Sequence, residues 1–353
     1  MSKSPFNGFA AEFAPRDAVD RGVRAVLIGL FLMVAITIPA HLSAQYLDLV
    51  TKGMAYSVGA LSLVVLVGLV GQFSLAQAGF MGVGAFTAAH LVSGGNVPFV
   101  IALPLGGLAA VPVGMLAAIP ALRVSGVYLA VVTLSFGEVL QKLFFDSEYN
   151  GGTLGHVALP RPGALQDGIH YFWFELFVLM ALIAFVCMFR TRRTGRNLAA
   201  VRESEAAALS VGINTTRAKI TAFGVSAFIA GIGGVLYSAG SGVASPDSFT
   251  PFDSIALLSV AVIGGLGSAA GAVAAGLFKT VTPVFIKDYI PFGSSAPELA
   301  GVAFGAGLVV QLLTAPLGVT SNLLVAERRL AGVVRFALRR QTAHPAASIE
   351  VIN

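Results

Sequence analysis

The run MAYSVGALSLVVLVGLV occupies residues 54–70 and is followed at once by GQFSLAQAG at residues 71–79. The first stretch supplies most of a membrane-spanning helix, which needs roughly 20 apolar residues. The second stretch interrupts the apolar pattern with glycine and glutamine. Backbone left unpaired in hydrocarbon is costly, so a broken helix persists only beside protein or a water-filled cavity. These residues therefore predict a helical membrane bundle that contains a broken segment.

The composition of the whole chain supports this prediction. Of its 353 residues, 56% are hydrophobic and 11% are charged, whereas soluble domains carry about 25% charged residues. The mean hydropathy is +0.85. These values exclude a soluble globular chain and a disordered one. A membrane β-barrel is disfavoured because its strands alternate polar and apolar residues over about 10 positions, whereas the apolar runs here are continuous.

The apolar runs predict an all-α polytopic membrane protein with about 8–10 transmembrane segments, some of them short or broken. The membrane domain is expected at residues 25–320, between a tail at 1–24 and a basic tail at 321–353. The runs lie at residues 25–40, 54–70, 74–91, 97–122, 126–145, 171–189, 220–239, 254–263, 269–286 and 299–317.

Basic residues set the expected orientation. They gather in the two tails, at Arg123 and in the loop 190–219, and the positive-inside rule places such segments in the cytoplasm. We therefore expect both termini and this loop to be cytoplasmic. The net charge of +5 is accounted for by topology and does not indicate nucleic-acid binding.

Two interpretations of the breaks remain open. Glycines at such places allow tight helix crossings, but discontinuous helices also line the substrate paths of transporters. On the second interpretation, the path would use small or polar residues at the two interruptions. These residues are Gln72, Ser74, Gln77, Gly264, Gly265 and Gly267.

A further candidate for the path is the acid Glu138. On helical spacing it shares a face with Tyr128, Ser135 and Lys142. Ionisable residues inside membrane spans are rare and suggest a function. The alternative is that Glu138 and Lys142, one turn apart, neutralise each other. Glu175 and Lys279 lie near segment ends, where they are expected to snorkel.

The loop 190–219 contains TRRTGRNLAAVRESEAAALSVGINTTRAK at residues 191–219. Residues 198–211 suit a short helix whose apolar stripe would be Leu198, Val201 and Leu209. Gly212 is expected to end this helix, and residues 214–216 to cap the next span. The helix is either a solvated connector or a coupling helix, because an apolar stripe with a charged rim suits docking into a partner's groove.

Enzyme signatures are missing from the sequence. No G-x-S-x-G, H-E-x-x-H or paired-carboxylate pattern occurs. One cysteine and five scattered histidines give no metal-ligand spacing. GAVAAGLFKT at residues 271–280 has two residues too many for a phosphate-binding loop and lies in an apolar span. We therefore expect no catalytic residue, no metal and no nucleotide site in this chain.

The loop resembles the EAA loop of ABC-importer permeases. More closely, GRNLAAVRESEAAALSVGINTTRAKITAFGVSAFIAGIGGVLYS at residues 195–238 resembles the branched-chain amino acid (LIV-type, LivM-like) ABC transporter permease family. Residues 71–86, 122–141 and 254–278 support the resemblance, which covers about residues 50–320. Ala76-Gln77 stands where members of the family often have Gly-His.

The resemblance implies a multi-pass permease subunit of a bacterial ABC importer in the inner (plasma) membrane, without an enzyme activity or a cofactor of its own. Its cargo would be branched-chain or other hydrophobic amino acids. Its partners would be two ABC ATPase subunits that bind ATP, a second homologous permease, and a periplasmic or extracellular substrate-binding protein. The residues that would couple it to the ATPases are Arg196, Leu198, Val201, Arg202, Glu203, Glu205, Ala206, Ala207 and Gly212.

Two other functions stay open. A stand-alone ion-coupled secondary transporter would use Glu138 as its proton or ion site, and it would transport as a purified single chain. A LIV-type permease for urea, amides or another small organic solute would share the assembly but not the cargo.

Overall fold

The computed structural model of the 353-residue chain describes residues 37, 39, 42–150, 152 and 155–289. The chain divides into two compact units. One is Met1–His41 with Val319–Asn353, and the other is Leu42–Gly318, which contains all the helices described below. The expected spans at 25–40 and 299–317 and both expected tails lie outside the described residues.

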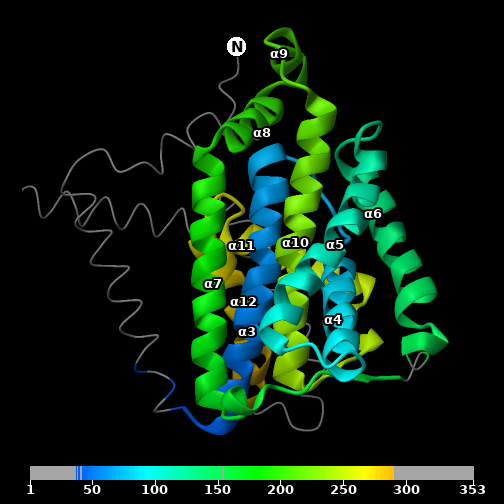
Figure 1. Ribbon diagram of the computed structural model, residues 1–353. Coiled ribbons are helices and arrows are strands. Elements are labelled where there is room, and N and C mark those ends of the chain that lie inside the picture. The colour runs from blue at the N-terminus through cyan, green and yellow to red at the C-terminus, as the bar shows by residue number, and fades with distance from the viewer. Residues whose placement is uncertain (1–36, 38, 40–41, 151, 153–154, 290–353) are drawn as a thin grey trace, which may run out of the picture. The chain divides into compact units, whose positions relative to one another are not determined.

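Most of the described residues are helical (Figure 1). The helices are α3 (Ala44–Leu63) continued by the π-helical η2 (Val64–Leu69), α4 (Gln77–Ser93), α5 (Phe99–Ala121), α6 (Val127–Leu140) continued by the π-helical η3 (Gln141–Phe145), α7 (Gly168–Thr191), α8 (Arg193–Glu203), α9 (Glu205–Ser210), α10 (Thr215–Ser241), α11 (Pro251–Gly264) and α12 (Ala269–Tyr289). The short elements are η4 (Glu148–Asn150), η5 (Gly163–Leu165), η6 (Pro246–Phe249), and the strands β1 (Val157–Ala158) and β2 (Val243–Ala244), which pair antiparallel.

Five helices of the described part are long and apolar enough to cross a membrane. They are Ala44–Leu69, Phe99–Ala121, Val127–Phe145, Gly168–Thr191 and Thr215–Ser241. Two shorter apolar helices are Pro251–Gly264 and Ala269–Val284. The predicted all-α polytopic class is confirmed, and every predicted span within the described residues falls on a helix. The β1–β2 pair was not predicted.

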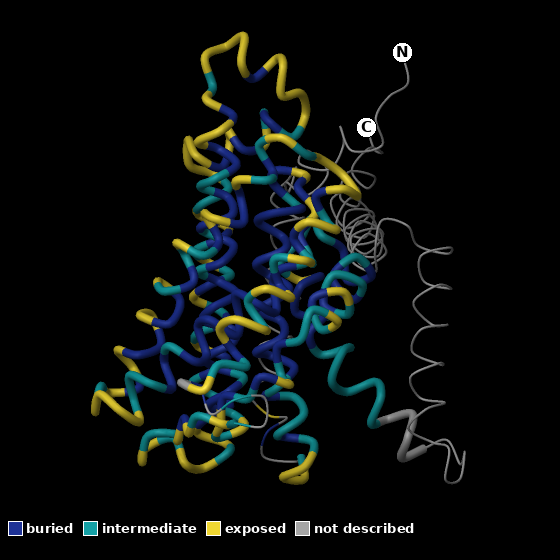
Figure 2. Tube along the Cα trace, turned by 90° about the vertical axis from the view of Figure 1, so that its right-hand side faces the viewer, coloured by how far each residue is buried: buried dark blue, intermediate teal, exposed yellow. Residues whose placement is uncertain are grey.

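Helix α10 lies at the centre of this unit, where it packs against α3, α4 and α5. In the most apolar 18-residue stretch of α10, 72% of the residues are buried, and in that of α3–η2 the share is 83%. In the corresponding stretch of α6 and η3, only 22% of the residues are buried. Figure 2 shows the buried residues along the middle of the trace and the exposed ones at its ends and outer side. The core therefore follows α3 and α10, and α6 stands at the rim.

The central helices approach closely because small residues stand where they cross. A Cβ placed on Gly234 of α10 would overlap the backbone of Met81 in α4, and one on Gly84 would overlap Gly231. Close backbone approach through small residues is the usual packing of membrane helices. At these crossings the glycines serve helix packing.

The two predicted breaks are confirmed as non-helical segments. After η2, Gly71 has a φ of +73°, a left-handed conformation that glycine adopts without a steric penalty. No helix resumes until Gln77, three residues later than the run from residue 74 predicted. Residues 265–268 form the second break, a short turn between α11 and α12 in which Gly265 has a φ of +105°.

The loop 190–219 folds as two helices, not as the single helix predicted for residues 198–211. Ser204 leaves helical geometry between α8 and α9, and its side chain accepts a hydrogen bond from Ala207 N at 3.2 Å. As predicted, Gly212 follows the end of α9, with a φ of +81°, and Asn214 caps α10. Both helices lie where α7 ends and α10 begins (Figure 1). We call this the α8–α9 end.

Candidate functional site

The apolar face of α8 packs against its own bundle. Leu198 is fully buried and Val201 is 5% exposed, because α8 lies against α7, α10 and η2. These two residues are therefore not a docking surface, which corrects the predicted stripe. Leu209 and Val211 are 56% and 73% exposed, since the break at Ser204 turns α9 away from the bundle. A partner that docks here would meet α9.

The other predicted coupling residues divide between the tip and the bundle. Arg196 is exposed, and its Nη1 donates to the Thr191 carbonyl oxygen of its own segment. Arg202 is half-buried and points toward the end of η2. The remaining predicted coupling residues are exposed and lie around α9. They are Glu203, Glu205, Ala206, Ala207 and Gly212.

Lys219 joins three helices at the α8–α9 end. Its side chain is 5% exposed, and its Nζ lies 2.9 Å from Glu205 Oε1 at the start of α9. The same ammonium donates to the Ala121 carbonyl oxygen at 3.3 Å. That carbonyl is at the C-terminus of α5, where carbonyl groups have no partner within their helix. Glu205 therefore anchors the docking tip to α5 and α10.

The polar side chains of the first break do not line an opening. Gln77 is fully buried, accepts from Ser62 Oγ at 2.9 Å and donates to Ser226 Oγ at 3.3 Å. This network links α3, α4 and α10 and accounts for Gln77 without a substrate. Ser74 is also fully buried. Gln72 is 9% exposed, and its Oε1 has no hydrogen-bond partner among the described residues.

Gly264, at the end of α11 beside the second break, allows a tight crossing. A Cβ on Gly264 would overlap the Gly271 carbonyl oxygen, so these glycines let α11 and α12 pack together. Gly267 offers its carbonyl oxygen to Arg190 Nη1 at 3.0 Å. A Cβ on Gly68 would overlap the Leu266 carbonyl oxygen. The end of η2 and the α11–α12 turn are therefore in direct contact, which brings the two breaks together.

The path candidates on helix α6 face outward. Tyr128 is 76% exposed, and Ser135 and Glu138 are also exposed. Lys142 pairs with Asp146 at 3.8 Å, so the predicted Glu138–Lys142 pair is wrong. The π-helical η3 begins at Gln141 and changes the register there. Within the described residues, the Glu138 carboxylate has no hydrogen bond and no ion pair. The nine path candidates therefore do not converge on one site.

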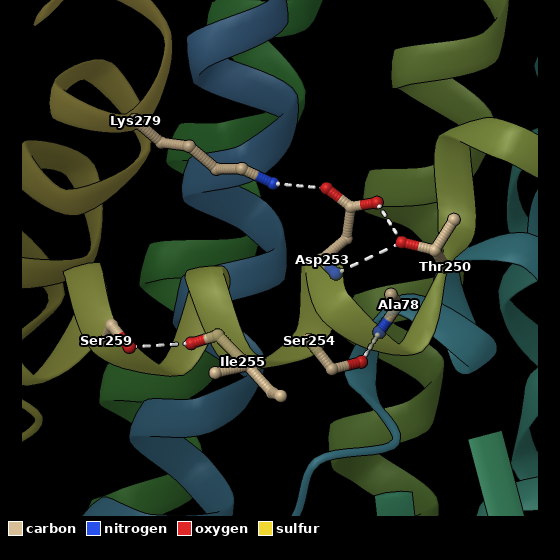
Figure 3. Close-up of polar contacts among 7 residues, drawn as sticks. All are labelled: Ala78, Thr250, Asp253, Ser254, Ile255, Ser259 and Lys279. Carbon is tan, nitrogen blue, oxygen red and sulfur yellow. Dashed lines mark hydrogen bonds and ion pairs between the residues drawn. The ribbon is translucent and has the colours of Figure 1, made fainter. Parts of the chain in front are cut away.

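An ion pair inside the bundle was missed by the sequence analysis (Figure 3). Lys279 of α12 lies 3.0 Å from Asp253 Oδ1, and Thr250 Oγ1 donates to Asp253 Oδ2 at 2.8 Å. The Lys279 ammonium also lies 3.7 Å from the ring centroid of Tyr56. The predicted snorkelling of Lys279 is thus wrong. Thr-x-x-Asp before an apolar run is a helix-start signature that could have indicated Asp253.

Two helix starts meet beside this pair. Ser254, in the first turn of α11, accepts a hydrogen bond from Ala78 N in the first turn of α4 at 2.9 Å. Glu175 of α7, also expected to snorkel, is fully buried instead, and its carboxylate has no hydrogen bond among the described residues. Among all the residues that the structure describes, no three His, Cys, Asp or Glu residues form a group able to hold a metal.

Residues 45–312 match the family described as "Branched-chain amino acid transport system / permease component". The chain belongs to this permease family. It is a multi-pass membrane protein and a permease subunit of an ABC importer. The match covers all the long apolar helices described above apart from the first residue of α3.

Individual relatives agree with the family. The permease is 32% identical to the high-affinity branched-chain amino acid transport system permease protein LivM of Salmonella typhimurium, over 81% of its own chain and 72% of the relative. LivM of Escherichia coli is 31% identical over the same shares. LivH of Salmonella typhimurium is 31% identical over 40% of the permease and 44% of LivH. No solved structure matches the permease.

Proposed function

We propose that this permease carries branched-chain or other hydrophobic amino acids across the bacterial inner membrane, driven by two partner ATPases that bind at the α8–α9 end. The observation that carries the proposal is the exposed tip formed by α9. Both LivM relatives are named as permeases of high-affinity branched-chain amino acid transport. The α8–α9 end, both termini and the tails are assigned to the cytoplasm by their basic residues.

The tip has the character of a docking element. Leu209 and Val211 form its exposed apolar part, and Glu203 and Glu205 form a charged rim. An apolar ridge of this kind, bounded by charge, fits a hydrophobic groove on a partner. Because Lys219 holds Glu205 in place, force applied to the tip is carried directly into α5 and α10.

A second permease subunit is proposed to cover the outward face of α6. A charged side chain at the centre of a membrane helix costs about 2.5–3.5 kcal/mol on insertion scales. Glu138 is therefore expected to face protein or a water-filled path, and lipid is a poor environment for it. We place the translocation path at this interface, lined by Tyr128, Ser135 and Glu138. The LivH similarity supports a second, related permease as the partner.

The cargo is expected to arrive as a neutral or zwitterionic solute. The outward face of α6 carries one acid among largely apolar residues, which suits a small amino acid with an apolar side chain. A soluble binding protein would deliver it from outside. Urea, amides and other small organic solutes are the competing cargo class, which a competition assay separates from amino acids.

The assembly is tested by purification and reconstitution. The permease is isolated in mild detergent from its native membrane, and its companions are identified by mass spectrometry. The complex is then placed in proteoliposomes with ATP and radiolabelled leucine, with unlabelled urea and acetamide as competitors. We expect two ATPases, a second permease and ATP-dependent leucine uptake that urea does not inhibit. A chain that purifies alone would overturn the proposal.

The docking tip is tested by substitution. Leu209→Ser with Val211→Ser is expected to reduce the co-purifying ATPase at least tenfold, because the apolar contact is lost while the bundle is untouched. Val243→Ser is the control, since Val243 is 37% exposed in β2 and lies outside the α8–α9 end. Unchanged ATPase recovery with the double variant would remove the tip from the interface.

A second candidate function is stand-alone ion-coupled transport. The observation in its favour is the carboxylate of Glu138, which lies within a membrane helix and has no partner among the residues that the structure describes. On this function, the purified single chain would accumulate leucine when a proton gradient is imposed, without ATP. Glu138→Gln would abolish that uptake.

A further inference from the structure

Two arginines at the α8–α9 end reach beyond their own helices to the two breaks. Arg202 of α8 donates through Nη1 to the Gly68 carbonyl oxygen in η2. Arg190, in the last turn of α7, donates through Nη1 to the Gly267 carbonyl oxygen at 3.0 Å. Each arginine therefore binds the backbone of a different interrupted helix.

The fit of Arg202 depends on the glycine that follows η2. A Cβ on Gly71 would stand 3.2 Å from Arg202 Cγ, so the stem of the arginine lies along this glycine. The last carbonyl groups of a helix have no partner within it, and a cation there is favoured by the helix dipole. Burial lowers the pKa of Arg202 below its ordinary value, an effect that Glu203 opposes and Arg190 reinforces. Arg202 is thus built into the end of η2.

The two carbonyl groups belong to backbone segments that touch. Gly68 is in direct contact with the Leu266 carbonyl oxygen, one residue before Gly267. A side chain at residue 68 would force these segments apart. Arg190 and Arg202 therefore hold two adjoining pieces of the same junction, and they hold it from α7 and α8, which follow each other directly in the chain.

The junction leads toward the middle of the bundle. Residues 71–76 run without helical structure from η2 to the first turn of α4. Leu75 N donates to Thr133 Oγ1 of α6 at 2.9 Å, and Ala78 N donates to Ser254 Oγ of α11 at 2.9 Å. A displacement of Gly68 would thus reach α4, α6 and α11 through residues 71–76 and their hydrogen bonds to Thr133 and Ser254.

We propose that Arg202 and Arg190 are positioning residues that transmit movement of the α8–α9 end to both breaks together. The inference rests on the proposed function, because the movement originates in ATPases bound to α9. It assigns to Arg202 a role that faces the bundle, whereas the docking role belongs to Leu209 and Val211. Docking and transmission are therefore separable by mutation.

The first test measures coupling in the purified complex with its partner ATPases. The measured quantity is leucine transported per ATP hydrolysed in proteoliposomes. Arg202→Ala is expected to lower this ratio at least tenfold while the ATPases still co-purify, and Arg202→Lys to restore it in part by keeping the charge. Arg193→Ala is the matched control, because Arg193 is exposed on the same helix and its ratio is expected to stay within twofold of the wild type.

The second test follows the break itself. Phe73 is 40% exposed between η2 and α4. Phe73→Cys in a Cys187→Ser background is alkylated with a maleimide, with and without ATP and vanadate. Nucleotide trapping is expected to change the labelling rate at least threefold when Arg202 is present and less than 1.5-fold with Arg202→Ala. If Arg202→Ala does not accumulate, Arg202→Lys and Arg190→Lys carry both measurements, with a reduced ratio and a reduced response expected.

The outcomes separate the two proposals. A wild-type complex without ATP-driven uptake would overturn the proposed function, and this inference with it. A wild-type complex that couples, beside Arg202 variants that keep both the ratio and the labelling response, would overturn the inference alone. Loss of ATPase binding in the Arg202 variants would also overturn it, by making Arg202 part of the docking surface.

Discussion

Helices α10 and α6 are both apolar and long enough to cross a membrane, but their surroundings differ. In the most apolar 18-residue stretch of α10, 72% of the residues are buried, whereas in that of α6 the share is 22%. Helix α10 carries glycines at residues 224, 231, 233, 234 and 240, whereas α6 carries Gly137 alone. The helix with small residues on several sides is the one that other helices cross. Hydropathy alone does not distinguish the two.

The same difference applies to their polar groups. Ser226 of α10 belongs to the closed network with Ser62 and Gln77. Glu138 of α6 has no partner among the described residues, although it is the more costly group to leave in hydrocarbon. Ser226 of the central helix thus finds hydrogen-bond partners within this chain. The carboxylate of the rim helix finds none among the described residues. Four substitutions test this contrast, from the largest expected effect to the smallest.

Gly234→Val is expected to abolish the native bundle. A side chain at this position would overlap the Met81 backbone, which cannot move without separating α4 from α10. Overpacking a core costs about 1–3 kcal/mol, and a clash of a side chain with the backbone of a neighbouring helix lies at or above the upper end. Fluorescence-detected size exclusion should show loss of the monodisperse peak. Gly163→Ala, where a Cβ meets open space, should keep it, and a monodisperse Gly234→Val would contradict the described crossing.

Lys279→Met is expected to destabilise the bundle by about 3 kcal/mol, the lower end for removing one partner of a buried ion pair. The lower end applies because Asp253 and Lys279 are 28% and 13% exposed. Thermal unfolding in detergent measures the effect. The double variant with Asp253→Asn should be more stable than Lys279→Met alone, since no unpaired carboxylate remains.

A matched control for this pair lies on α3. Lys52 pairs with Asp48 at 2.8 Å, but their side chains are 30% and 41% exposed. Exposed pairs one helical turn apart contribute about 0.3–0.5 kcal/mol, so Lys52→Met should change the unfolding temperature little. Equal effects of the two lysine substitutions would show that the burial of Lys279 has no energetic consequence.

Gln77→Leu is expected to cost about 1–2 kcal/mol, because Ser62 and Ser226 each lose a hydrogen-bond partner in a buried network. The KM for leucine should stay at the wild-type value, since Gln77 does not line the proposed path. Thermal unfolding and uptake kinetics measure the two effects separately. Gln166→Leu, at an exposed loop position, serves as the control. A changed KM with unchanged stability would return Gln77 to the path.

Glu138→Gln is expected to leave stability within about 0.5 kcal/mol, as for other exposed substitutions, yet to lower leucine uptake at least tenfold. The reason is that, on the proposed function, the outward face of α6 meets the second permease and the cargo. Thermal unfolding of the isolated chain and uptake by the complex are compared with Glu148→Gln, an exposed acid outside the proposed path. Wild-type uptake by Glu138→Gln would leave α6 without a role in the path.

The spans and the breaks were predictable from the sequence because both are local. Apolar runs of sufficient length decide where helices cross a membrane, and glycine-rich interruptions decide where they stop. Gly212 and Asn214 were likewise predicted correctly, since a helix stop and a helix cap depend on neighbouring residues. The break at Ser204 was not predicted, because the alanine-rich residues on both of its sides favour a helix.

Much of the candidate site was not predictable for a different reason. Arg202 and Gly68 are 134 residues apart, and Arg190 and Gly267 are 77 apart, so no local pattern relates them. Helix α8 does carry the apolar stripe of Leu198 and Val201 that its spacing predicts. Periodicity does not show whether such a stripe packs against its own bundle or against a partner, and for this reason the two residues were assigned to a docking surface that they do not form.

The π-helical η2, at the end of the first described span, is a place where the chain can lose one residue without disturbing the helix on either side. A π-turn bonds residue i to i+5 and so holds one residue more than an α-turn. Deleting one residue from Val64–Leu69 would convert the turn to α-helix and leave both flanks in place. The same deletion in α5 would rotate one half of that helix against the other by about 100°. Homologues shorter by a single residue are therefore expected to carry their gap at η2 or at the other π-helical segment, η3 (Gln141–Phe145).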